Sequence, residues 1–111
     1  MTSPLNPIDR KWMQEALALA REAAEADEVP VGAVVISPDG RIVGKGHNLR
    51  ERDQSPIAHA EILAIQEAAK TQGTWRLTDC LLVVTLEPCP MCLAACQQAR
   101  IAIVVFGAND P

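Results

Sequence analysis

The chain has 111 residues, a formal net charge of −4 and 49% hydrophobic residues. This length suits one domain with a single core. The charge is uneven, since residues 1–40 have three Lys or Arg against seven Asp or Glu, whereas residues 41–111 have seven of each. The composition argues against a uniformly basic nucleic-acid-binding protein, although Lys45, Arg50 and Arg52 form a local basic cluster.

No signal peptide, lipidation signal or apolar run of membrane-spanning length is visible, so we expect a cytoplasmic protein without a membrane partner. Four cysteines are present, and in a reducing compartment they should stay reduced. There, a Cys-x-x-Cys spacing indicates metal binding or catalysis rather than a structural disulfide.

The first element predicted is an amphipathic helix in "NPIDRKWMQEALALAREAAEA", with Asn6 as its cap and Pro7 at its first helical position. Its apolar residues recur at helical spacing: Ile8, Trp12, Leu19 and Ala23. The segments "VPVGAVVIS" and "RIVGKGHN" flank a turn signal at residues 37–40 and predict a β-hairpin. The polar residues 50–55 that follow predict a loop.

The second half of the chain predicts alternating helices and strands. A helix is expected over residues 56–70, and a short one over residues 91–99. The apolar runs at residues 80–86 and 101–106 are typical of strands that are covered on both faces. Because strand, helix and strand in that order require a right-handed crossover, they predict a parallel pair within an α/β mixed sheet that has helices on its faces.

A histidine and a glutamate stand together in "AHAEILAI", in or near the first turn of the second predicted helix. Glu61 falls at helical spacing from Ile57, Ile65 and Ala68, on an apolar stripe where a carboxylate needs a partner. The sequence therefore predicts a compensating group close to Glu61.

The segment "PCPMC" offers that group. Cys89 and Cys92 are three residues apart at a predicted helix start, where both sulfurs can reach one point and where the helix N-terminus favours thiolates. With neutral His59 they supply three ligands for one Zn²⁺ and leave the fourth tetrahedral position for water. We expect a catalytic zinc site of His59, Cys89 and Cys92, with Glu61 as the proton carrier.

Three other interpretations of these residues stay open. His59 could be a packed histidine beside a solvated Glu61, and Cys89 and Cys92 could form a dithiol redox centre with Pro90 between them. A closed structural zinc site would recruit Cys96 as a fourth ligand. We expect instead that Cys80 and Cys96 are small core residues and that His47 lies in a loop or at a strand end.

His-x-Glu followed by Pro-Cys-x-x-Cys is the signature of zinc-dependent nucleoside and nucleobase deaminases. The segments "VPVGAVVI", "GKGHN", "AHAEILAI", "VTLEPCPMC" and "RIAIVVFGAND" closely resemble the bacterial tRNA-specific adenosine deaminases, from the first helix to the last residue. The resemblance implies a three-layer α/β/α fold of the cytidine-deaminase type. It also implies a homodimer that hydrolyses adenosine to inosine at the wobble position of a tRNA anticodon.

The same resemblance implies roles for three further residues. Asn48 should hydrogen-bond the flipped adenine, Val31 should help to wall the base pocket, and Asp110 should touch a neighbouring ribose. Because members of that family continue into a further strand and a C-terminal helix that contacts RNA, we expect this short chain to bind the anticodon loop weakly. Deaminases of free guanine or cytidine have the same zinc motif and are the enzymatic alternative.

Overall fold

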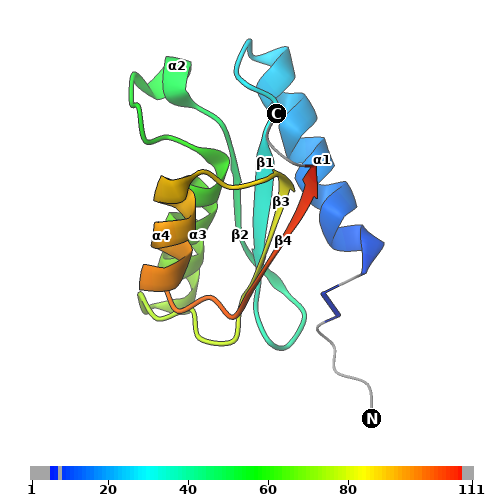
Figure 1. Ribbon diagram of the computed structural model, residues 1–111, viewed down its shortest axis with the longest axis vertical. Helices are drawn as coiled ribbons and strands as arrows, with labels where there is room; N and C mark the ends of the chain where they lie inside the picture. The colour runs from blue at the N-terminus through cyan, green and yellow to red at the C-terminus, as the bar shows by residue number, and fades with distance from the viewer. Residues whose placement is uncertain (1–5, 8, 109–111) are drawn as a thin grey trace.

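The computed structural model of the protein describes residues 6–7 and 9–108. These residues form three layers, in which helix α1 covers one face of a four-stranded sheet and helices α3 and α4 cover the other face (Figure 1). This arrangement confirms the α/β/α class expected from the sequence. No helix in the described part of the chain is both long enough and apolar enough to cross a membrane.

The sheet is mixed, with the order β2-β1-β3-β4. Its strands are β1 (Gly32–Ile36), β2 (Ile42–His47), β3 (Leu81–Leu86) and β4 (Ile103–Ala108). Strand β1 pairs antiparallel with both β2 and β3, whereas β3 and β4 are parallel. The predicted hairpin and the predicted parallel pair are therefore both confirmed.

Strand β1 lies in the middle of the sheet and is completely buried. Because successive side chains of a strand point to opposite faces, Ala33 and Val35 join the core beneath α3 and α4, while Val34 and Ile36 join the core beneath α1. A continuous apolar segment is therefore what this strand requires, since each face of β1 contacts a helical layer.

Helix α1 (Arg10–Glu25) begins later than predicted. Asp9 is its N-cap and accepts a hydrogen bond from the backbone N–H of Lys11, whereas the carbonyl of Asn6 accepts from the Trp12 indole. The prediction of Asn6 as the cap was wrong because Asp9 supplies a capping carboxylate closer to the apolar run. The helix buries Trp12, Ala16, Ala20 and Ala23, and Ile8 lies outside the described residues.

The other helices also differ from prediction at their boundaries. Residues predicted as a loop contain a short helix, α2 (Arg50–Asp53). Helix α3 (Ala60–Gln72) begins four residues later than expected, because residues 55–58 form a turn closed by the Ala58 N–H on the Ser55 carbonyl. Helix α4 (Pro90–Gln98) matches the predicted third helix within one residue at each end.

The expectation that strand β4 is covered on both faces was wrong. Its apolar run indicated a strand covered on both faces, yet Ile103 and Phe106 are 46% and 41% exposed. The reason is positional, since β4 is the outermost strand of the described sheet while β3, next to it, is covered on both faces. Hydrophobic pattern alone does not distinguish a central parallel strand from an edge strand.

Candidate metal centre

Two helix N-termini meet at the predicted metal site. His59 is the N-cap of α3, Cys89 is the N-cap of α4, and Cys92 lies in the first turn of α4. The two helices lie side by side on the same face of the sheet (Figure 1). Their N-termini direct partial positive charge at this point, which favours anionic groups such as thiolates.

The three predicted ligands converge. Nδ1 of His59 lies 3.5 Å from Sγ of Cys92 and 3.7 Å from Sγ of Cys89, and all three ligand atoms lie within 4.8 Å of one another. Zinc bonds of about 2.0 Å to nitrogen and about 2.3 Å to sulfur in a tetrahedron place N and S about 3.5 Å apart. His59, Cys89 and Cys92 therefore fit a zinc ion, and a set of three protein ligands is typical of catalytic sites.

Glu61 lies next to the three ligands and is only 4% exposed. It is in the first turn of α3, two residues after His59, and its carboxylate is beside the Cys92 thiol. Burial raises the pKa of that thiol above its ordinary value, and the charge of Glu61 raises it further. The partial positive charge of the α4 N-terminus acts in the opposite direction, because it favours the thiolate.

This thiol chemistry bears on the redox alternative. A dithiol redox centre needs only the two cysteines, whereas Nδ1 of His59 lies within 3.7 Å of both sulfurs. A bound cation favours this arrangement, since it draws the proton off a coordinating thiol. The convergence of His59 with both cysteines is therefore better explained by metal ligation than by disulfide exchange.

A pocket of about 130 Å³ opens beside the ligands. It is lined by Val29, Val31, Asn48, Arg50, His59, Ala60, Glu61, Leu86, Glu87 and Cys89. The structure thus places both Asn48 and Val31, which the family resemblance assigned to base binding, in the lining of the same pocket as Glu61. Asp110, the third residue assigned in this way, lies outside the described residues.

The side chain of Asn48 is oriented by its own neighbourhood. Asn48 is 5% exposed, and its Oδ1 accepts a hydrogen bond of 2.9 Å from the backbone N–H of Arg50. Because that N–H can only donate, the amide oxygen must face it and the amide NH₂ group must face elsewhere. Since Asn48 lines the pocket, this NH₂ group is a donor suited to an acceptor atom of a ligand.

The remaining cysteines and the second histidine are not part of the ligand group in the described chain. Cys80 and Cys96 are buried in the core beneath α3 and α4, as predicted, and burial raises the pKa of Cys96 to about 11. His47 ends β2, and its Nε2 lies 3.9 Å from a carboxylate oxygen of Glu22. The geometry therefore favours three ligands over a closed site that includes Cys96.

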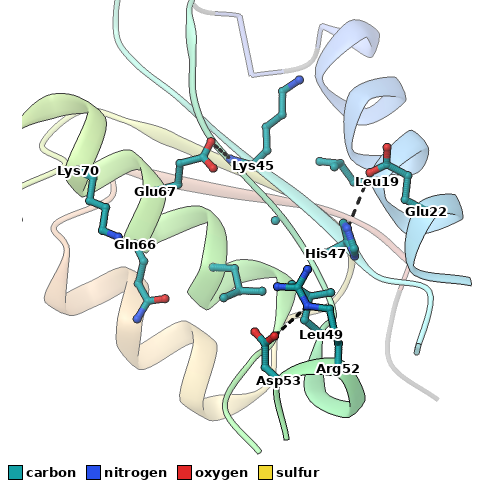
Figure 2. Close-up of a pocket in the computed structure, with 12 residues that line it drawn as sticks. Leu19, Glu22, Lys45, His47, Leu49, Arg52, Asp53, Gln66, Glu67 and Lys70 are labelled. Atoms are coloured by element: carbon teal, nitrogen blue, oxygen red, sulfur yellow. Dashed lines mark hydrogen bonds and ion pairs between the residues drawn. The ribbon is translucent and has the colours of Figure 1, made fainter. Parts of the chain in front are cut away.

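A larger hollow of about 460 Å³ lies away from the metal ligands, over β2 between α1 and α3 (Figure 2). Its walls carry both signs of charge, and Arg52 pairs with Asp53, while the His47 ring lies beside the Glu22 carboxylate. None of its lining residues belongs to the ligand group. Its size alone does not connect it to the chemistry of Glu61.

Sequence reasoning missed several residues of the smaller pocket. Val29 and Leu86 were assigned only to predicted strands, and Glu87 was noted only within the resembling segment "VTLEPCPMC". Arg50 was noted for its charge but was assigned to a loop, whereas it begins α2 and lines the pocket. The weak signal that could have found them is position, because all four lie at or beyond a strand end on the side where His59 and Cys89 lie.

The sequence matches a known family model. The model of the cytidine and deoxycytidylate deaminase zinc-binding region matches residues 7–108. The tRNA-specific adenosine deaminase of Bacillus subtilis is 53% identical over 103 residues, which are 93% of this chain and 63% of that protein. The tRNA(Ile)-lysidine synthase of Deinococcus radiodurans is 56% identical over 108 residues, 97% of this chain but 18% of that protein. The chain thus spans less than two thirds of either relative.

Solved structures agree with this similarity. A structure from a study of A-to-I editing by tRNA:A34 deaminases at the wobble position of transfer RNA superposes with a TM-score of 0.89 at 45% identity. The match covers 93% of this chain and 74% of that one. Guanine deaminase from Bacillus subtilis gives a TM-score of 0.87 at 39% identity, covering 95% of this chain and 66% of that one.

Proposed function

Because the chain belongs to the cytidine and deoxycytidylate deaminase zinc-binding family, we propose that it converts adenosine to inosine at the wobble position of a tRNA anticodon. One observation carries the proposal: the ligand group His59, Cys89 and Cys92 lies beside Glu61 at a single pocket. The similarity to tRNA-specific adenosine deaminases supports RNA adenosine as the substrate. Zinc is the metal of the family, and these three residues would hold it.

The protein's own residues can carry the proton transfers. Bound zinc supplies water of lowered pKa, near 7 in hydrolytic zinc enzymes. The Glu61 carboxylate, beside Cys92, would take one proton from water and deliver it to a ring nitrogen of adenine. It would then take the second proton, from the hydroxyl group added at C6, and pass it to the departing amine as the bond from C6 to that amine breaks. Water and adenosine are thereby converted to inosine and ammonia.

The pocket wall gives the base its orientation in this proposal. The Asn48 NH₂ group donates to an acceptor nitrogen of adenine, and Val31 contacts the ring. An anticodon loop suits so small a pocket because its bases are unpaired, which lowers the cost of moving one base out of its stack. Zinc thiolates need reduced cysteines, so we place this work in a reducing compartment such as the cytoplasm.

The test is an inosine assay on defined substrates. The zinc-loaded chain is incubated with an anticodon stem-loop that has adenosine at the wobble position, and the digested RNA is analysed for inosine by mass spectrometry. A stem-loop with guanosine at that position is the matched control. Ammonia release from free guanine or cytidine, without inosine in the RNA, would contradict the proposal and would favour a free-base deaminase such as the structurally similar guanine deaminase.

The second part of the proposal is a homodimer formed through α3 and α4. Between these helices lies an open hollow of about 620 Å³, lined by Ile65, Gln66, Ala69, Trp75, Ala95, Gln98 and Ala99. Leu93, on α4, is also exposed. Contiguous apolar surface of this kind favours association with a matching surface, and a two-fold dimer uses the same patch twice.

A further inference from the structure

Glu28 is a buried carboxylate for which the proposed reaction has no use. It follows α1 in a tight turn, where Asp27 has a positive φ of 60° and the Glu28 N–H donates to the Ala23 carbonyl. Its side chain is 6% exposed, although glutamate is rarely buried without partners. The hydrogen-bond partners of the Glu28 side chain therefore indicate its role.

The carboxylate of Glu28 caps helix α2. Its Oε1 accepts a hydrogen bond of 3.0 Å from the backbone N–H of Glu51, and its Oε2 accepts one of 2.9 Å from that of Arg52. The helix has no capping side chain of its own, since its N-cap is Leu49. Glu28 therefore satisfies donors in the first turn that would otherwise lack an intrahelical partner.

This contact joins the two loop walls of the candidate active-site pocket. One wall contains Val29 and Val31, directly after Glu28, and the other contains Asn48 and Arg50, at the start of α2. A second link between the walls is the hydrogen bond of 3.2 Å from the Asn48 N–H to the Val31 carbonyl. The Glu28 carboxylate is the side-chain clamp between the same two segments.

The clamp also acts on the orientation of the Asn48 amide. The N–H of Arg50, which fixes the Asn48 oxygen, belongs to the same first turn as the two N–H groups that Glu28 holds. If that turn shifts, the Arg50 N–H shifts with it and no longer holds the Asn48 amide oxygen in place. Helix α2 also carries Arg52 and Asp53 on the side of the larger hollow, where they pair with each other (Figure 2).

We propose that Glu28 is a positioning residue, whose carboxylate holds the first turn of α2 so that Asn48 and Arg50 face the substrate pocket. The inference rests on the proposed deaminase function for its kinetic consequence. It does not place Glu28 in contact with substrate or metal. Glu28 thus affects how well substrate is held, whereas Glu61 affects how fast the bound substrate reacts.

Two substitutions and one control separate these roles. Glu28→Gln keeps the shape but offers one acceptor oxygen, and its NH₂ group faces a backbone donor. Glu28→Asp keeps the charge but is one methylene shorter. The control is Glu25→Gln, which removes an exposed carboxylate at the end of α1, three residues away.

For Glu28→Gln and Glu28→Asp we expect KM for the anticodon stem-loop to rise about tenfold, the effect of one lost hydrogen bond to a charged group. We expect kcat to stay within about threefold of the parent value and zinc content to stay at one per chain. Amide hydrogen exchange at Glu51 and Arg52 should accelerate in both variants. Glu25→Gln should match the parent chain in every measurement.

Opposite results would overturn the inference. Unchanged exchange at Glu51 and Arg52, or faster exchange with unchanged KM, would show that Glu28 does not position the pocket wall. A fall in kcat together with zinc loss would show a role in the metal centre or in folding, which circular dichroism of both variants would distinguish. The exchange measurement needs no activity, so failure of the parent chain to deaminate RNA would refute the proposed function and leave the clamp separately testable.

Discussion

Glu61 is buried beside the metal ligands, and burying a carboxylate is costly unless hydrogen bonds or a bound cation compensate its charge. We expect Glu61→Gln to lower kcat by about 10²- to 10⁴-fold, because that is the usual value of a positioned proton carrier. Zinc content and the melting temperature should stay close to those of the parent chain. Inosine formation under single-turnover conditions measures the effect, and turnover near the parent rate would refute the assignment of Glu61.

The identity of the metal ligands can be tested by comparing two buried cysteines on the same helix. Cys92→Ser should lose zinc, because its sulfur lies 3.5 Å from Nδ1 of His59 and within the ligand group. Cys96→Ser should retain one zinc per chain, because Cys96 is part of the core and lies outside that group. Elemental analysis of the dialysed proteins measures both, and zinc loss from Cys96→Ser would support a closed four-ligand site.

Thiol reactivity gives a related expectation. Since burial raises the pKa of Cys96 to about 11, its thiol stays protonated at pH 8, three units below that value. The thiolate is the reactive form, so Cys96 should be alkylated far more slowly than an exposed cysteine. Mass spectrometry after brief iodoacetamide treatment tests this, with the urea-unfolded chain as the control. Rapid labelling of Cys96 in the folded protein would contradict its placement in the core.

At the scale of elements, two glycines of β2 allow α3 to lie directly on the sheet. A Cβ atom on Gly46 would lie 2.3 Å from the backbone oxygen of Ala60, and one on Gly44 would lie 2.1 Å from that of Ala64. Both oxygens belong to backbone, which cannot move without displacing the helix. The close contact therefore determines where the N-terminus of α3, and with it His59, lies relative to the pocket.

We expect Gly46→Val to lower the free energy of unfolding by about 3 kcal/mol or more, at the upper end of the range for overpacking a core. The displaced start of α3 should also weaken zinc binding. Lys45→Val is the matched control, because Lys45 is the neighbouring residue of the strand, is exposed, and points to the other face. Urea unfolding of both variants measures the difference, and equal stabilities would show that α3 does not pack as closely as described.

At the scale of the whole molecule, the proposed dimer predicts different effects for leucine substitutions on the two sides of the sheet. Leu93→Asp places a charge on the exposed face of α4 and should convert a dimer into a monomer. Leu17→Asp is the matched control, since both leucines are 43% exposed but Leu17 lies on α1, across the sheet. Sedimentation equilibrium at micromolar concentration distinguishes the outcomes. A parent chain that is monomeric, or equal disruption by both variants, would contradict a dimer through α3 and α4.

The overall charge of −4 also makes a prediction for RNA binding. Of the local basic cluster, Arg50 lines the pocket, while Arg52 pairs with Asp53 and the Lys45 ammonium lies 3.9 Å from Glu15. Three phosphate contacts from this cluster predict that affinity for the stem-loop falls about 20-fold between 50 and 200 mM salt. Fluorescence anisotropy at the two salt concentrations measures this. Binding that is independent of salt would show that phosphate contacts do not dominate.

The sequence by itself determined the order of the main helices and strands and the group of residues on which the chemistry depends. The continuous apolar runs "GAVVI" and "LLVVTL" indicate buried strands because a strand that is covered on both faces needs apolar side chains in both directions. The spacing of Cys89 and Cys92 indicates a ligand pair because a zinc site needs particular donor types within reach of one point. These are local properties, and local pattern is sufficient to predict them.

Only the tertiary structure decided which further segments surround the ligand group and which apolar strand lies at the edge of the sheet. The burial of Glu28 against the N-terminus of α2, and the exposure of Ile103 and Phe106 at the edge of the sheet, depend on contacts between residues far apart in sequence. The same holds for the pocket that brings Asn48 to Glu61. A helix of four residues such as α2 is too short to give a periodic signal, and two of its backbone N–H groups bond to a carboxylate more than twenty residues away.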